Sequence, residues 1–225
     1  MNCSYLSLVL LFFLGLNLPL ICQNVIMPSG SLGLHNYDRP SKLNYNEIDG
    51  SPYLLKDYVL GKAMRTDGVY IDSLSMKYDL ATFHFIALDD NNEIAINGIY
   101  YKQFVLEIDG EEVLFKRVDP KTPERFYEII YEGEELTIYK VTVVKMEKGK
   151  YSGISKSNDR FFKKTKYMVR VGRNTEKVKL KKKNLWKYFD VDQQRILEEY
   201  IKENNIKLKK DKDFRSLFKI LHNGA

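Results

Sequence analysis

Short runs of aromatic and β-branched residues, broken by turn residues, occupy the chain from Gly50 to about residue 180. Runs of this length and composition are typical of β-strands. Several alternate apolar and polar positions, as strands do when one face is buried. The pattern predicts strands at residues 53–55, 58–64, 75–80, 82–88, 93–97, 102–108, 111–118, 126–131, 134–146, 161–172 and 176–180.

Turn residues connect these predicted strands as hairpins. Asp109-Gly110 separates two alternating runs and favours a type I′ turn, in which both central residues have positive φ. Residues 89–92 and 97–98 predict two more tips, and residues 173–175 are expected to join the last two strands. In the run 134–146 both the odd and the even positions are apolar, which predicts a central strand covered on both faces.

After residue 181 the apolar period changes from that of a strand to that of a helix. Residues 182–189 predict one short helix, Asp192 is expected to cap a second, and Asp211 or Asp213 a third. The apolar stripes are Ile196, Leu197, Tyr200 and Ile201 in the second helix, and Phe214, Leu217, Phe218 and Leu221 in the third. The predicted fold class is α+β, with a mainly antiparallel β meander (a sandwich or a half-barrel) followed by a C-terminal helical segment.

The first residues have the pattern of a secretory signal peptide. Residues 6–18 are almost entirely apolar, and Pro19 ends the run shortly before Cys22. A run this short suits the core of a signal peptide better than a membrane span. We therefore expect a signal peptide at 1–22, a flexible arm at 23–46, and a single β-rich domain at 47–225 with a helical tail at 182–223. Two alternatives stay open: a lipoprotein signal in which Cys22 is lipidated, and an uncleaved anchor.

Both cysteines, Cys3 and Cys22, lie in this segment. Cleavage before Gln23 would leave a mature chain without a thiol, which excludes disulfides, a cysteine nucleophile and thiolate zinc sites. The expected location is the periplasm or the extracellular medium. In the alternative, the protein is anchored to a membrane through lipidated Cys22.

The formal net charge of +6 is unevenly distributed. Residues 160–187 contain twelve Lys or Arg and a single acid, Glu176, so an anionic partner is a natural hypothesis. Aromatic residues alternate with these cations, a combination that nucleic-acid grooves also use, although the expected export argues against nucleic acid as the ligand. The candidate surface consists of Lys163, Lys164, Lys166, Arg170, Arg173, Lys177, Lys179 and Lys181.

Partners that fit such a surface outside the cytoplasm are anionic lipid headgroups, lipopolysaccharide, acidic glycans or another protein. The alternative interpretation is a solvated edge hairpin, because lysine on an edge strand discourages edge-to-edge pairing. Alternation is expected to direct Val178 and Leu180 inward and the neighbouring lysines outward. The sequence leaves the oligomeric state open.

In several short sequence segments the chain resembles a family of uncharacterised exported proteins of Bacteroidota. The resemblance covers residues 50–223, and one of the segments that carry it, Lys77-Tyr78-Asp79, stands where the family has Arg-Tyr-Asn. The resemblance implies export and a shared fold, and it brings no activity, ligand or catalytic residue. The remaining segments are Gly50-Ser51-Pro52-Tyr53-Leu54 with Gly61, and residues 126–130, 139–141, 167–169, 181–185 and 200–209.

No motif for catalysis or for a cofactor is visible, so we predict no catalytic residue, no cofactor and no metal site. His35, His84 and His222 lie in no metal-ligand spacing, and residues 89–93 suit a solvated hairpin tip better than a calcium loop. The pairs Glu111-Glu112 and Glu134-Glu135 directly follow turns, where acidic side chains usually only solvate the end of a strand. The sequence favours a non-enzymatic binding or structural module of the cell envelope. The alternatives are a carrier of an apolar or lipid ligand, in a sheet curled around a cavity, and a hydrolase of envelope polymers.

Overall fold

The computed structural model describes residues 39–40, 45, 48–149, 151–152, 155–156 and 158–223. The predicted signal peptide at 1–22, most of the predicted arm at 23–46 and His35 lie outside the described residues. No helix in the described ranges is both long enough and apolar enough to cross a bilayer.

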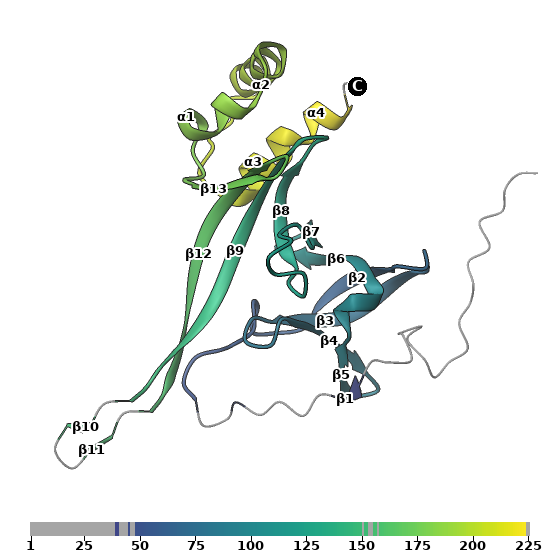
Figure 1. Ribbon diagram of the computed structural model, residues 1–225, viewed down its shortest axis with the longest axis vertical. Coiled ribbons are helices and arrows are strands. Elements are labelled where there is room, and N and C mark those ends of the chain that lie inside the picture. The colour runs from purple at the N-terminus through teal and green to yellow at the C-terminus, as the bar shows by residue number, and fades with distance from the viewer. Residues whose placement is uncertain are drawn as a thin grey trace, which may run out of the picture.

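One large antiparallel sheet dominates the fold, followed by C-terminal helices, which confirms the predicted α+β class (Figure 1). The strand order is β1-β5-β4-β3-β2-β6-β7-β8-β9-β12-β13, so most strands pair with their neighbours in sequence. Two very short strands, β10 (Tyr151–Ser152) and β11 (Ser155–Lys156), form a separate pair. The strands of the large sheet are β1 (Arg39–Pro40), β2 (Val59–Arg65), β3 (Tyr70–Asp79), β4 (His84–Asp89), β5 (Asn92–Ile96), β6 (Tyr101–Ile108), β7 (Glu111–Lys116), β8 (Tyr127–Glu132), β9 (Leu136–Glu147), β12 (Arg160–Val171) and β13 (Asn174–Val178).

The turn chemistry explains why the hairpins form where they do. Asp109 and Gly110 have φ values of 53° and 75°, so the predicted type I′ turn is confirmed. The last hairpin turns one residue earlier than predicted, because Gly172 adopts a φ of 55° and Val171 pairs with Asn174. Residues 53–55 form no strand, and only Tyr53 makes an isolated bridge, to Asp79.

The sheet bends so strongly that β2–β6 lie across the direction of β9 and β12 (Figure 1). Aromatic side chains fill the bend. The ring centroid of Phe85 lies 3.9 Å from that of Phe104 and 4.5 Å from that of Tyr78, and Phe115 and Phe126 pack edge-on against Phe85. A gap of only about 10 Å³ lies beside this cluster, room for one water at most. The rings that could have lined a ligand cavity are packed against each other.

The long strand β9 is covered on both faces over its first half, as predicted. Leu136 and Ile138 face the helices, whereas Tyr139 and Val141 join a cluster on the opposite face. From Lys145 onward the strand is exposed, so the predicted two-sided burial does not extend over the whole run.

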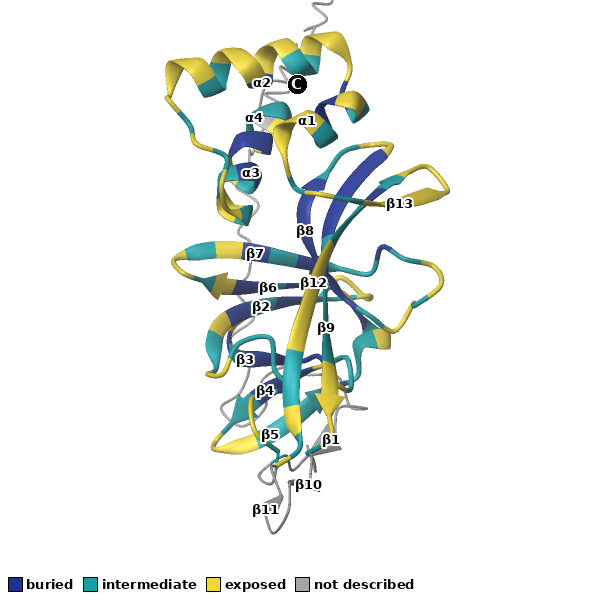
Figure 2. Cartoon of the chain, turned by 90° about the vertical axis from the view of Figure 1, so that its left-hand side faces the viewer, coloured by how far each residue is buried: buried dark blue, intermediate teal, exposed yellow. Residues whose placement is uncertain are grey.

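The C-terminal helices cover one end of this sheet (Figure 2). Phe214, Leu217 and Phe218 are buried against β8 and β9, as the apolar stripe predicted. The second helix begins two residues earlier than expected. Asp190 caps it, since its carboxylate accepts from the Gln193 N–H and the Gln193 side chain accepts from the Asp190 N–H. The elements are α1 (Lys182–Leu185), η2 (Trp186–Tyr188), α2 (Val191–Glu203), α3 (Asp211–Phe218) and α4 (Ile220–Asn223), with a further short turn, η1 (Gly98–Tyr100), before β6.

A strap, residues 48–54, crosses from the start of β12 to the end of β3. The Asp49 N–H donates to the Asp159 carbonyl, and the Phe161 N–H donates to the Asp49 carbonyl, both at 2.8 Å. Glycine is required at Gly50, where φ is 86° and a Cβ would lie 2.7 Å from the Phe161 carbonyl oxygen. Further on, the Leu54 N–H donates to the Tyr78 carbonyl.

Buried charges on β3 hold the strap against the sheet. The Lys77 ammonium lies 4.1 Å from the ring centroid of Tyr53 and 4.4 Å from that of Tyr58, and it pairs with Glu93 at 2.6 Å. The carboxylate of Asp79 is fully buried and accepts from the Tyr45 hydroxyl at 2.9 Å. The segment Lys77-Tyr78-Asp79 therefore serves the fold, because its lysine is paired with Glu93, its carboxylate is hydrogen-bonded and its tyrosine lies in the aromatic core.

Candidate anion-binding site

A pocket of about 320 Å³ opens where β13 ends. β13 pairs with residues 167–171 of β12 only, and after Val178 the chain turns away through a hydrogen bond from the Lys181 N–H to the Lys179 carbonyl. The segment before α3 closes the far side. We call this the basic pocket, and its lining is Thr165, Lys166, Tyr167, Lys177, Val178, Lys179, Leu180, Lys181, Lys209 and Asp211.

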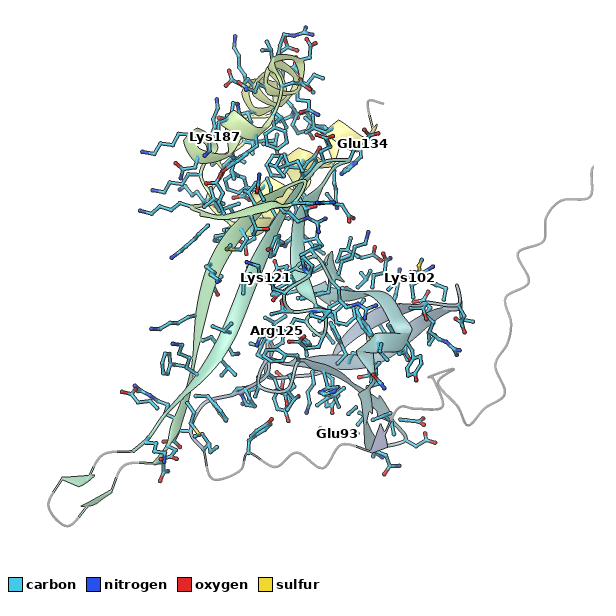
Figure 3. All side chains as sticks on the ribbon, in the orientation of Figure 1. Glu93, Lys102, Lys121, Arg125, Glu134 and Lys187 are labelled. Carbon is cyan, nitrogen blue, oxygen red and sulfur yellow. The ribbon has the colours of Figure 1, made fainter. Side chains whose placement is uncertain are left out.

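The lysines of the basic pocket have no acidic partner among the residues that the structure describes. Elsewhere in the described residues several lysines pair with an acid, for example Lys62 with Glu112 and Lys116 with Glu132, both at 2.6 Å. Figure 3 shows side chains that end in nitrogen extending outward along β12 and β13, below Lys187. The positive charge of the pocket is therefore uncompensated. The lysines concerned are Lys166, Lys177, Lys179, Lys181 and Lys209.

The acid in the lining, Asp211, does not neutralise these lysines. Its Oδ2 pairs with the Lys140 ammonium at 2.7 Å, and its Oδ1 accepts from the Tyr167 hydroxyl at 2.6 Å. Both partners come from the sheet, Lys140 from β9 and Tyr167 from β12, so each oxygen of this carboxylate is already engaged.

Half of the predicted surface meets in this pocket and half does not. The alternation of β13 is confirmed, because Val178 and Leu180 pack against the helical core while Lys177 and Lys179 are exposed. The members that line the basic pocket are Lys166, Lys177, Lys179 and Lys181.

The other predicted members lie apart from the pocket. The Lys163 ammonium donates to the Leu54 carbonyl at 3.1 Å, and burial lowers its pKa. Arg170 lies toward the hairpin end of β12 and donates to the Val118 carbonyl at 2.7 Å. Lys164 is exposed beside the ring of Phe162, and Arg173 is exposed at the hairpin tip.

Sequence reasoning missed Lys209 and Asp211. They precede and begin α3, about 30 residues after β13, and no periodicity connects them to the sheet. The one available signal is the acidic first turn of α3. The Asp213 carboxylate accepts from the N–H groups of Lys209 and Lys210, both at 2.8 Å, which fixes the backbone that presents Lys209. Those two hydrogen bonds lower the pKa of Asp213.

An ion network joins α3 to the sheet behind the pocket. Lys140 lies 3.0 Å from Glu128 and 2.7 Å from Asp211, and Arg215 lies 2.7 Å from Glu128 and 3.3 Å from Glu111. Burial alone would lower the pKa of Lys140, but the two carboxylates raise it above its ordinary value. The network fixes the position of α3, and with it one wall of the basic pocket.

Comparison of the chain with protein-family models, curated proteins and solved structures gives no match in any of the three. The case for a function therefore depends on the geometry of this chain.

The Tyr167 hydroxyl supplies a test of the contact that anchors Asp211. Burial, and then the hydrogen bond to Asp211, raises the pKa of Tyr167 above its ordinary value near 10. A raised folded-state pKa means that the stabilisation is complete below pH 10 and is lost as the pH rises toward the folded-state value. In urea unfolding between pH 8 and 11, Tyr167→Phe should show a shallower loss of stability above pH 10 than the parent chain. Parallel profiles would contradict this account of Tyr167.

The residues considered for catalysis or metal binding are engaged elsewhere or stand alone. Glu111 pairs with Arg215, and Glu112 pairs with Lys62. His84 is exposed at the start of β4, and His222 stacks on Tyr131 with ring centroids 5.4 Å apart. Within the described residues no group of His, Cys, Asp or Glu is arranged to hold a metal ion.

A second cleft, of about 440 Å³, lies between the strap, β7 and α3. Its walls include Leu55, Ile108 and Val113, but its floor is the network of Glu128, Lys140 and Arg215. A carrier of apolar cargo needs a predominantly apolar lining. The charged floor makes this cleft a poor match for such a ligand.

Proposed function

We propose that this chain is an exported, non-enzymatic protein of the cell envelope that docks an anionic partner in the basic pocket. The observation that carries the proposal is the convergence of lysines from β12, β13 and the segment before α3, none of them paired with an acid among the described residues. Export rests on the apolar run at residues 6–18 and on the resemblance to exported proteins of Bacteroidota.

Electrostatics make this a reasonable role for the pocket. Each lysine close to an anionic surface contributes roughly 1 kcal/mol of attraction, and the effect falls off within the Debye length of about 8 Å at physiological salt. Unpaired lysines gathered around one hollow also repel one another, so an anion that enters relieves this repulsion. The same five lysines on a flat strand face would contribute less, because solvent would screen each one separately.

Reversing three charges of the pocket is expected to weaken anion binding strongly. Lys177→Glu/Lys179→Glu/Lys181→Glu should weaken binding of dextran sulfate at least about 100-fold, since three lost attractions of roughly 1 kcal/mol each give about this factor. Calorimetric titration at two salt concentrations measures it, and the parent chain should bind more weakly at the higher concentration.

A matched variant separates the pocket from the overall charge. Lys56→Glu/Lys102→Glu/Lys121→Glu makes the same change in net charge with three exposed lysines outside the pocket, two of which are labelled in Figure 3. This variant should bind dextran sulfate within about twofold of the parent chain, because long-range charge is screened. Equal losses in the two triple variants would refute the pocket as the docking site.

A further inference from the structure

The middle of β12 has a free edge. On one side β12 pairs with β9 along its whole length, from Arg160 to Val171, without a register shift. On the other side it pairs with β13 from Tyr167 onward and, near its start, with Asp49 of the strap. Between these two partners, residues 162–166 have no strand beside them among the described residues, and Figure 2 shows this stretch of β12 largely exposed.

The backbone groups that face this gap can be identified. Neighbouring residues of a strand direct their N–H and C=O groups to opposite sides. The Phe161 N–H donates to Asp49, so Phe161 faces away from β9. By the same alternation Lys163 and Thr165 also face away from β9 and into the gap, whereas Lys164 faces β9. Lys163 and Thr165 thus offer two donors and two acceptors to a partner strand.

The gap has the size of a short peptide. From Phe161 to Tyr167 an extended chain spans about 20 Å at about 3.3 Å per residue. The far end of the gap opens directly into the basic pocket, whose lining includes Thr165, Lys166 and Tyr167. A strand entering in line with β13 would therefore run through a positively charged channel.

We propose that the anionic partner is an extended acidic peptide segment that pairs with β12, antiparallel to it and in line with β13. This inference rests on the proposed function and deepens it by naming the class of partner. The peptide would bond to the backbone of Lys163 and Thr165, and its acidic side chains would meet Lys164, Lys166 and Lys177. Main-chain bonds give such strand addition its affinity, and side chains give it selectivity.

The lysines decide between an acidic peptide and a second copy of this chain. Two copies pairing through this edge would place lysines opposite lysines, which is the repulsion that protects edge strands from self-association. An acidic strand turns the same repulsion into attraction. A sulfated glycan or an anionic lipid headgroup could meet the lysines, but neither can repeat the hydrogen-bond spacing of a strand.

The experiment compares a short peptide that alternates Glu with Val against two N-methylated versions of it. Methyl groups on the amides that face β12 block strand pairing, whereas methyl groups on the alternate amides leave it intact and preserve the charge. We expect the first version to lose at least tenfold in affinity and the second to bind as the parent peptide does. Dextran sulfate is titrated in parallel as an anion that cannot form a strand.

A variant of the protein gives an independent test of strand pairing. Thr165→Pro removes an N–H that faces the gap and leaves the ladder with β9 intact, a position where an edge strand tolerates proline. This variant should bind the peptide at least tenfold more weakly than the parent chain and should bind dextran sulfate with unchanged affinity. Thr165→Val keeps the N–H and should bind both probes as the parent chain does.

The outcomes separate this inference from the proposed function. If the peptide binds with equal affinity in all three forms, strand addition is wrong, while binding of dextran sulfate through the pocket lysines still supports anion docking. If neither dextran sulfate nor the peptide binds, both proposals fail. Should Thr165→Pro unfold the protein, the two methylated peptides on the parent chain decide the question alone.

Discussion

Phe85→Ala is expected to lower the free energy of unfolding by about 3–5 kcal/mol, the range for truncating a buried phenylalanine. The side chain is 1% exposed and lies at the centre of the bent sheet, in ring contact with Tyr78, Phe104, Phe115 and Phe126. These neighbours come from β3, β6, β7 and the residue just before β8, and the bend restricts how far they can move. A cavity should therefore remain after truncation, which adds to the lost burial. Urea unfolding monitored by far-UV circular dichroism measures the change.

Phe162→Ala is the matched control for this truncation. It deletes the same atoms from a half-buried ring on β12, whose ring-face neighbour is the ammonium of Lys164 at 5.4 Å. Its cost should stay below about 1.5 kcal/mol, because little apolar surface is lost. If both variants unfold at the same urea concentration, the bend of the sheet is not closely packed around Phe85.

Lys140→Met should cost about 3 kcal/mol, the second large effect. Lys140 lies between the carboxylates of Glu128, which is 7% exposed, and Asp211. Removing one member of a buried ion pair leaves an uncompensated charge and typically costs about 3–5 kcal/mol. The lower end applies here because Glu128 keeps Arg215 at 2.7 Å and Asp211 keeps the Tyr167 hydroxyl. The free energy of unfolding in urea at pH 7 is the quantity to measure.

Two further variants test this explanation. Glu128→Gln in the Lys140→Met background removes the charge left without its lysine, so the double variant should recover at least about 1 kcal/mol relative to additivity. Lys62→Met removes an ion pair of similar length, 2.6 Å, in which Glu112 is largely exposed, and should cost much less than Lys140→Met because solvent screens the pair. Costs that are equal for Lys140→Met and Lys62→Met would argue against burial as the cause.

The sequence predicts the elements of this fold well because their local chemistry is explicit. Type I′ turns at Asp109-Gly110 and the stripe of Phe214, Leu217 and Phe218 need only residues close together in sequence. The errors also have local causes. Strand β3 begins at Tyr70, five residues before the predicted start, where Ser73 has a φ of 58° and β2 shifts register between Gly61 and Ala63. Such an irregularity breaks the alternation that the prediction depended on.

The candidate site was predictable only in part because it is assembled from distant segments. The alternation of β13 identified Lys177 and its neighbours, since strand geometry fixes which side they face. Nothing in the sequence indicates that Lys209 would face the end of β13, because α3 reaches that position through ion pairs with Glu128 and Lys140, more than 70 residues away. The free edge of β12 is equally hidden, because it depends on where β13 ends and where the strap turns away.

The strap gives this meander an order of assembly. Among β2–β7 most strands pair with the next strand in the chain, so most of these pairings need only short loops to close, and β2 with β6 is the longer-range exception. The strap instead joins Leu54 to Lys163, 109 residues later. The chain emerges N-terminal residues first, so the aromatic core and the hydrogen bond from Leu54 to Tyr78 can form before β12 is present. The other end of the strap, at Asp49, has no partner until β12 has emerged. Residues that precede the whole aromatic core in the chain therefore complete their native contacts only after that core can form.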